Sequence, residues 1–168
     1  LVDQAELVHV GGQRRAVALV ARHDLDLRFG DVAVDADLVL AREVAELLGT
    51  ARDVLDGTLG GGGHSQSLLE QGARVTGIDR DPEAIASGRE RFAGEPRLTL
   101  VRGSFGQLAG LVRAAGWNDG LQGVLLDLGV SSPQVDEARR GLSFMQDGPL
   151  DMRMDNEPGQ SPAHWLAR

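Results

Sequence analysis

The sequence has 168 residues, of which 42% are hydrophobic, and a formal net charge of −8. This size and hydrophobic content are typical of one globular domain or part of one, and the acidic balance disfavours non-specific nucleic-acid binding, which requires a basic face. The chain has neither cysteine nor lysine, which excludes disulfides, thiolate metal sites, thiol nucleophiles, Schiff-base chemistry and the phosphate-binding lysine of P-loops.

The N-terminal segment carries no recognisable motif. Residues 16–21 have the composition of a strand, and a hairpin turning at Gly11-Gly12 or an extension without regular structure are the alternatives. Apolar residues at helical spacing then predict a helix between Asp37 and Leu48, with Gly49 as its C-cap. We therefore treat residues 1–30 as an extension of unknown structure.

A strand, a glycine run, a helix and a second strand follow in close succession. Val54-Leu55 predicts a short buried strand, Gly60–Gly63 turns the chain, a helix begins near Ser65, and the strand Val75–Ile78 ends at Asp79. Glycine permits positive φ and a close approach of ligand to backbone. An acid about twenty residues beyond such a loop holds the ribose in Rossmann-type folds. The pattern predicts a nucleoside half-site; the alternative is a tight turn without a ligand.

The next segments continue the alternation of helices and strands. We predict a helix from Pro82 to about Ala93, a strand over Leu98–Val101, a helix ending near Gly116 and a fourth strand over Gly123–Leu128. The fourth strand is apolar on both faces, as a central parallel strand must be. Alternating elements of this kind predict an α/β doubly wound sheet with strand order 3-2-1-4.

Regular patterning stops after the fourth strand. Gly129–Asp155 predicts a long loop, and Ala163–Leu166 begins a helix just before the last residue. A doubly wound sheet of four strands is incomplete, so we expect a fragment in which the far edge of the fourth strand is unpaired.

Acidic residues surround the glycine run. Asp56 precedes it, and Asp79 and Asp81 follow the second strand. The pyrophosphate of NAD would be repelled there, whereas the sulfonium cation of S-adenosylmethionine would not. The residues therefore favour S-adenosylmethionine and leave an NAD-dependent oxidoreductase as the alternative.

Four signals fall at the carboxyl ends of the predicted strands, where open α/β sheets bind ligands. They are Gly60–His64, Asp79, Ser104-Phe105 and Asp127 with the run to Gln134. In a methyltransferase the first would hold the methionine end of the cofactor, the second the ribose and the third the adenine. The fourth would lie beside the methyl group that is transferred. Phe105 fits a core position equally well, and His64 fits a helix start, but Asp127 ends a buried strand, where a carboxylate without a partner is costly.

Five runs resemble the bacterial ribosomal RNA small subunit methyltransferase H family: Asp56–Ser65, Ile78–Pro82, Leu125–Gln134, Arg140–Phe144 and Asp147–Asp155. The resemblance covers about Leu38 to Arg168. It implies a Rossmann-like class I fold and transfer of a methyl group from S-adenosylmethionine to N4 of a cytidine in the decoding region of 16S rRNA.

The resemblance also implies roles for individual residues. Cofactor binding falls on Gly62, Gly63, His64, Asp79, Phe105, Asp127 and Gln134, and catalysis on Asp127, Ser131, Ser132 and Pro133, with no metal. Cytosine C5 methylation would use a cysteine nucleophile, and its absence favours the exocyclic amine. We assign residues 31–130 to the cofactor-binding half and residues 131–168 to the start of an inserted substrate-recognition region.

The resemblance implies 16S rRNA and the small ribosomal subunit as partners, and a cytoplasmic location. No apolar run approaches about eighteen residues, so no membrane segment is expected. The oligomeric state stays open, with a homodimer as one alternative. A further hypothesis is a non-catalytic nucleotide- or RNA-binding module, and we expect the fragment alone to be inactive.

Overall fold

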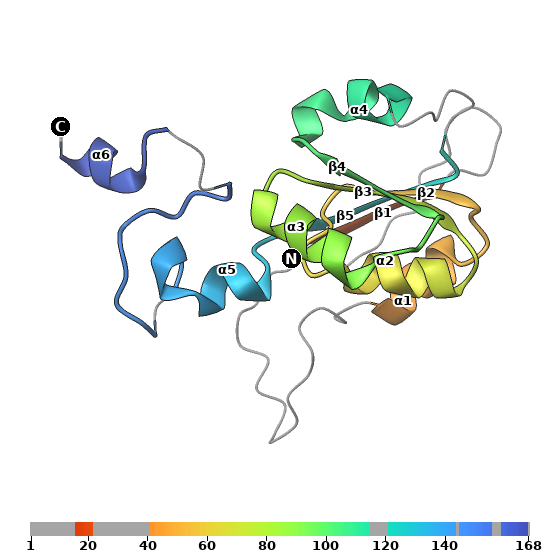
Figure 1. Ribbon diagram of the computed structural model, residues 1–168, viewed down its shortest axis with the longest axis horizontal. Helices are drawn as coiled ribbons and strands as arrows, with labels where there is room; N and C mark the ends of the chain where they lie inside the picture. The colour runs from red at the N-terminus through yellow and green to blue at the C-terminus, as the bar shows by residue number, and fades with distance from the viewer. Residues whose placement is uncertain (1–15, 22–40, 115–120, 144, 156–158, 168) are drawn as a thin grey trace, which may run out of the picture.

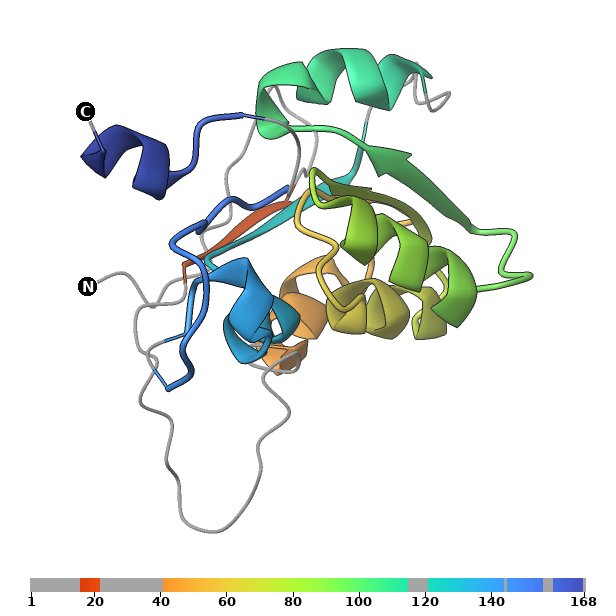
Figure 2. The same cartoon turned by 60° about the vertical axis from the view of Figure 1, so that its left-hand side comes forward.

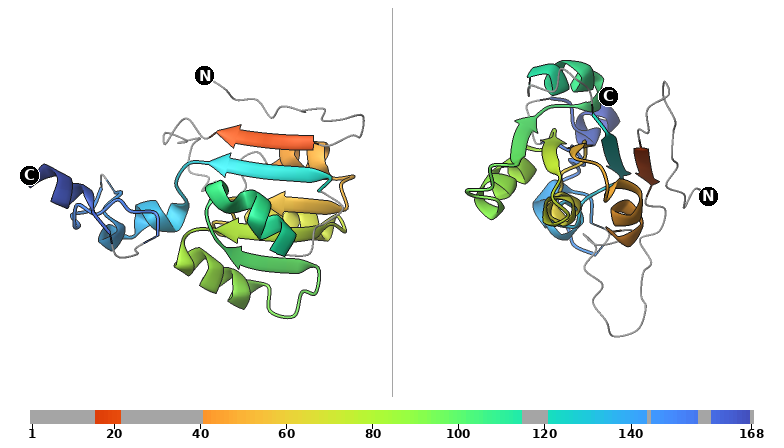
Figure 3. Two further views of the ribbon diagram at one scale, coloured as in Figure 1. Left: turned by 90° about the horizontal axis from the view of Figure 1, so that it is seen from above. Right: turned by 90° about the vertical axis from the view of Figure 1, so that its right-hand side faces the viewer.

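The computed structural model describes residues 16–21, 41–114, 121–143, 145–155 and 159–167. Within these residues, five strands form one sheet in the order β1-β5-β2-β3-β4. All four pairings are parallel, and Figure 3 shows the arrowheads at one edge of the sheet. The strands are β1 (Ala16–Ala21), β2 (Asp53–Asp56), β3 (Arg74–Asp79), β4 (Leu98–Arg102) and β5 (Gly123–Leu128).

Helices cover both faces of the sheet. One face carries α1 (Ala41–Leu48), α2 (Gly63–Glu70) and α3 (Pro82–Arg91), and the other carries α4 (Leu108–Ala114), which follows the 3₁₀ turn η2 (Phe105–Gln107) (Figure 1). The start of α3 is defined locally, because the Asp81 side chain accepts a hydrogen bond from the Glu83 amide and Pro82 occupies the first turn. The fold is therefore a Rossmann-like, doubly wound α/β sheet.

The predicted order of the four central strands is confirmed. Strands β4, β3, β2 and β5 lie side by side in that order, which is the predicted 3-2-1-4 arrangement. In the parallel register, Leu55 of β2 lies opposite Thr76 of β3 on one side and opposite Val124 of β5 on the other. The carboxyl ends of β2, β3 and β5 therefore meet at one edge of the sheet.

The expectation of an unpaired edge on the fourth strand is wrong. β1 pairs with β5 along its whole length, from Ala16 opposite Gly123 to Ala21 opposite Leu128. A strand is thus the correct alternative for residues 16–21, while the proposed hairpin at Gly11-Gly12 lies outside the described residues. The division of the chain at residues 30 and 130 stays a prediction.

The segment after β5 is more ordered than predicted. The expected loop contains α5 (Ser132–Asp136) and the 3₁₀ turn η3 (Ala138–Arg140), and the expected helix is present as α6 (Pro162–Leu166). Figure 2 brings this segment toward the viewer, and Figure 3 shows it beyond the arrowheads of the strands. It therefore lies on the side of the sheet where ligands of this fold class bind.

The hydrophobic core holds α1 and α2 against the sheet. Its buried members come from both helices, from three strands and from the residue before β3: Val44, Leu48, Val54, Leu68, Leu69, Ala73, Val75 and Leu125. Burying side chains of this size contributes roughly 1.5–3 kcal/mol each, so the core fixes where β2 ends and α2 begins. No helix in the described part of the chain is long and apolar enough to cross a bilayer.

Removing residues 1–21 should expose the edge of β5 that β1 covers. Unpaired backbone groups on a central apolar strand exchange faster and recruit other strands. We expect deuterium exchange of the freed β5 amides to accelerate by about tenfold or more, with self-association visible by sedimentation.

A variant lacking only residues 1–15 is the matched control, because it keeps β1. Equal exchange in the two truncated chains would show that β1 does not protect β5.

Candidate functional site

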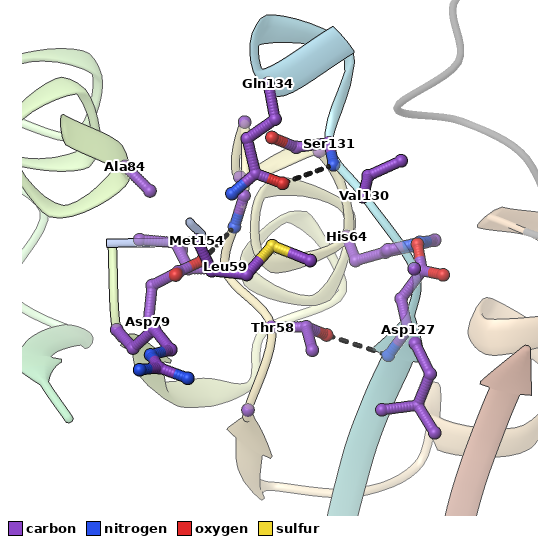
Figure 4. A pocket seen from close by; sticks show the side chains of 18 of the residues that line it. Thr58, Leu59, His64, Asp79, Ala84, Asp127, Val130, Ser131, Gln134 and Met154 are labelled. Atoms are coloured by element: carbon purple, nitrogen blue, oxygen red, sulfur yellow. Dashed lines mark hydrogen bonds and ion pairs between the residues drawn. The ribbon is translucent and has the colours of Figure 1, made fainter. Parts of the chain in front are cut away.

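A cavity of about 250 Å³ opens at the carboxyl edge of the sheet. It lies between the glycine run, the ends of β3 and β5, and the segment that follows β5 (Figure 4). Its lining includes Thr58, Gly60 to His64, Asp79, Arg80, Ser104, Asp127, Ser131, Gln134 and Met154. The cavity thus gathers residues that are widely separated in the sequence.

The glycine run bends because two of its residues have positive φ. Gly60 has φ 49° and Gly62 has φ 81°, a region that side chains other than glycine rarely adopt. A Cβ on Gly62 would also lie 2.7 Å from Cε2 of Phe92. Leu59 is buried and anchors the run, because its backbone amide donates a hydrogen bond to the Ile78 carbonyl at 3.0 Å. The backbone of the run is therefore held open toward the cavity.

Asp56 is fully buried beneath the glycine run. Its carboxylate accepts hydrogen bonds from Ser65 Oγ at 2.7 Å and from the Thr58 amide at 3.1 Å. Burial raises the pKa of Asp56, an effect that these bonds only partly offset. Thr58 Oγ1 in turn accepts from the Asp127 amide at 2.7 Å. The end of β2 is thereby tied to the end of β5.

Asp79 ends β3 and faces the cavity. Its Oδ2 accepts from the Gly60 amide and its Oδ1 from the Asp81 amide, both at 2.9 Å. Burial raises the pKa of the Asp79 carboxyl, and the hydrogen bonds from the backbone amides lower it by a smaller amount. A carboxylate has about four lone-pair sites, so Asp79 can still accept hydrogen bonds from a ligand's hydroxyl groups.

His64 of α2 and Asp127 of β5 lie side by side in the cavity wall (Figure 4). His64 Nε2 lies 3.4 Å from Asp127 Oδ2, and the two side chains are 7% and 10% exposed. This distance brings the groups within ion-pair range, but neither ring nitrogen of His64 makes a hydrogen bond to the described residues.

A buried arginine holds the outer wall of the cavity in place. Arg140 is 2% exposed, and its Nη2 donates to Asp81 Oδ2 at 2.6 Å and to the Met154 carbonyl at 2.9 Å. Gln134 Nε2 donates to the same Asp81 oxygen at 3.3 Å, while its Oε1 accepts from the Ser131 amide at 3.0 Å. The wall formed by these residues is therefore anchored to the start of α3.

The structure brings most of the predicted site residues together. Those that line the cavity are Gly62, Gly63, His64, Asp79, Asp127, Ser131 and Gln134. Ser132 and Pro133 begin α5, but their side chains, like that of Phe105, lie outside the described part of the structure; Ser104 next to Phe105 lines the cavity. The functional roles assigned to all of these residues stay predictions.

Sequence reasoning missed two contributors, Met154 and Arg140. Both lie in runs that carry the family resemblance, but neither run received a role. Their positions depend on a contact between Arg140 and Asp81, 59 residues earlier in the chain. No short-range pattern in the sequence points to this contact.

The chemistry of the cavity fits a cationic nucleoside better than a pyrophosphate. Asp79 and Asp127 line it, and Arg80, the one arginine among the described lining residues, is paired with Asp155. Charge of this sign attracts a cation and repels phosphate. Within the described ranges, no group of three or more histidine or acidic side chains is arranged to hold a metal ion.

Comparison with known proteins finds a matching family and close relatives. The model of the MraW methylase family matches residues 35–168. Ribosomal RNA small subunit methyltransferase H of Shewanella baltica (strain OS155 / ATCC BAA-1091) is 57% identical over 117 residues, which are 68% of this chain and 37% of that protein. Its namesake in Shewanella frigidimarina (strain NCIMB 400) is 51% identical, over 77% of this chain and 43% of that protein. The chain spans about two fifths of the length of these relatives.

Solved structures show partial likeness. The glycopeptide N-methyltransferase MtfA in complex with sinefungin matches with a TM-score of 0.37 and 27% identity, over 52% of this chain and 35% of that one. The CcbJ methyltransferase from Streptomyces caelestis matches with a TM-score of 0.35 and 26% identity, over 44% and 35%.

Asp56→Asn should reduce the dependence of stability on pH. Burial raises the pKa of Asp56 above the ordinary 3.8, so the folded state binds this proton more tightly than the unfolded state. Wild-type stability should therefore fall relative to the variant as pH rises from about 4, until the folded-state pKa is passed. Urea unfolding across this pH range measures the difference.

Asp53→Asn, at the partly exposed amino end of the same strand, is the matched control. A free-energy difference between wild type and Asp56→Asn that does not change with pH would contradict the assigned shift.

Proposed function

Because the chain belongs to the MraW methylase family, we propose that this protein is an S-adenosylmethionine-dependent methyltransferase that modifies N4 of a cytidine in 16S rRNA. The name of its relatives, ribosomal RNA small subunit methyltransferase H, supports an RNA substrate from the small subunit. The proposal includes a cytoplasmic location and the small ribosomal subunit as partner.

The observation that carries the proposal is the cavity at the carboxyl edge of the sheet. Its glycine run permits close approach to the backbone, Asp79 offers acceptors for a pair of ribose hydroxyls, and the acidic lining suits a sulfonium. Ser104 lies where β4 ends, in position to meet the adenine. When bound, S-adenosylmethionine supplies an electrophilic methyl group on its sulfonium sulfur.

Asp127 is the residue best placed to meet the acceptor amine. The exocyclic amine of cytosine is a poor nucleophile because its lone pair is delocalised into the ring. A carboxylate that accepts a hydrogen bond from this amine concentrates the lone pair on nitrogen, and positioning in line with the methyl supplies much of the rate. The Asp127 amide is bonded to Thr58 Oγ1 at 2.7 Å, so the carboxylate is held on rigid structure.

Ser131 and Gln134 organise the loop after β5. The Gln134 side chain closes onto the Ser131 amide at 3.0 Å and is also bonded to Asp81. This arrangement keeps the backbone from Leu128 to Ser131 against the cavity. We propose that these residues shape the opening through which the cytosine enters.

Asp79→Ala should weaken S-adenosylmethionine binding by about 1.5–3 kcal/mol, the usual value of hydrogen bonds to a charged group. Calorimetry measures this directly. Asp79→Asn is a useful second variant, because its amide oxygen can still accept from the Gly60 amide and the loop is thereby preserved.

Asp53→Ala removes a carboxylate at the opposite end of the sheet and should bind the cofactor like wild type. Unchanged affinity in both Asp79 variants would show that this residue does not hold the ribose.

Deleting the gene should abolish one N4-methylated cytidine in 16S rRNA. Wild type should restore it, and Asp127→Ala should restore it slowly, because such a transition-state contact is worth about 10² to 10³ in rate. Nucleoside mass spectrometry of rRNA measures the modification. Persistence of N4-methylcytidine in the deletion strain, or loss of 5-methylcytidine instead, would overturn the proposed reaction.

A further inference from the structure

Residues 147–155, here called the strap, pack backbone against backbone on the 3₁₀ turn η3. The Met152 amide donates to the Arg140 carbonyl at 3.1 Å. A Cβ at Gly148 would collide with the Ala138 carbonyl oxygen, so only glycine fits there. Met152 has φ 54°, a strained value for a residue other than glycine. Such strain persists only where the surroundings fix the backbone, so the strap follows one defined path.

The far end of the strap is tied to the residues where β3 ends. Arg80 donates to Asp155 Oδ2 from Nε at 2.9 Å and from Nη2 at 2.6 Å. Arg140 Nη2 donates both to Asp81 Oδ2 at 2.6 Å and to the Met154 carbonyl at 2.9 Å. The backbone of Met154 is therefore held in place relative to the end of β3.

Among the described residues of the strap, Met154 is the one that lines the cavity. Arg140 engages its backbone carbonyl, and Figure 4 shows its side chain pointing into the cavity. The other two methionines are more exposed, Met145 at 88% and Met152 at 47%. The strap thus delivers one flexible apolar side chain to the proposed cofactor site.

The strap reaches the cavity on the side assigned to adenosine. Arg80 and Ser104 line the cavity, and with Asp155 they also line a neighbouring hollow of about 360 Å³. Arg80 directly follows Asp79, the proposed ribose acceptor, and Ser104 lies where the adenine is expected. Because Met154 directly precedes Asp155, its side chain enters beside the ribose and adenine positions.

We infer that Met154 is a cofactor-binding residue whose thioether packs on the adenosine of S-adenosylmethionine, and that Arg140 is the positioning residue that holds it there; this inference rests on the proposed function. A thioether is polarisable and makes favourable contacts with aromatic rings such as adenine. Its unbranched chain adapts to the shape of a ligand. Met154 therefore adds apolar contact to a site in which Asp79 supplies hydrogen-bond acceptors.

The first test measures S-adenosylmethionine affinity by calorimetry. Met154→Ala should bind about five- to twentyfold more weakly, because the apolar contact is lost. Met154→Leu keeps the volume of the side chain and should stay within about threefold of wild type. Met145→Ala removes the same side chain at an exposed position and is the matched control. Equal affinities of Met154→Ala and wild type would overturn the inference.

Methyl ¹³C spectra of the methionines locate the contact directly. The chain has three methionines, and the signal missing from Met154→Leu identifies Met154. With saturating S-adenosylmethionine this signal should shift and show cross-relaxation with protons of the adenine or ribose, whereas the Met145 signal should not. A bound state without such cross-relaxation at Met154 would contradict the inference alone. A wild-type chain that binds no S-adenosylmethionine would overturn the proposed function and, with it, this inference.

A double-mutant cycle tests the role of Arg140. Arg140→Lys keeps the charge but cannot reach the same acceptors, so Met154 should lose its fixed position. In this background Met154→Ala should weaken binding by less than about twofold, against about five- to twentyfold in the wild-type background. The cycle cancels losses that Arg140→Lys causes through other residues. Equal losses in the two backgrounds would show that Arg140 does not position Met154.

Discussion

Negative charge collected at one edge of the sheet is the constraint around which the rest of the molecule is arranged. Parallel strands deliver their carboxyl ends to the same place, and here those ends carry aspartates: Asp56, Asp79, Asp81 and Asp127. A serine hydroxyl compensates Asp56, backbone amides compensate Asp79 and a guanidinium compensates Asp81, while Asp127 lies within ion-pair distance of an imidazole. Charges left unpaired in such an enclosed place would be costly, so the compensation dictates the local folding of the chain.

The guanidinium of Arg140 illustrates how this constraint organises distant segments. A buried ion pair is weak evidence for stability, since desolvation offsets much of the attraction. Its value here lies in geometry, because one planar group reaches Asp81, Glu83 and a backbone carbonyl at once. A lysine, with a single point charge, would not span these three acceptors. The arginine thus converts a charge requirement into a fixed position for the cavity wall.

The sequence predicted what local patterns determine. The glycine run, Asp79 at a strand end and the order of the central strands all follow from short-range spacing and from the handedness of parallel crossovers. What it missed depends on long-range pairing. The six residues of β1 have the composition of a strand, but their sequence does not indicate that the strand pairs with β5, which lies more than 100 residues later. The short helix α5 and the place of Met154 likewise depend on tertiary contacts, which propensity does not encode.

The distance along the chain between Asp81 and Arg140 also has a consequence for biosynthesis. Translation proceeds at about 5–20 residues per second, so the 59 residues between them take roughly 3–12 seconds to make. During that interval the nascent chain has its glycine run, Asp79 and Asp81 but not the arginine that pairs with Asp81. The outer wall of the cavity can therefore close only after Arg140 has been made, and until then these carboxylates of the emerging polypeptide are open to ions and chaperones.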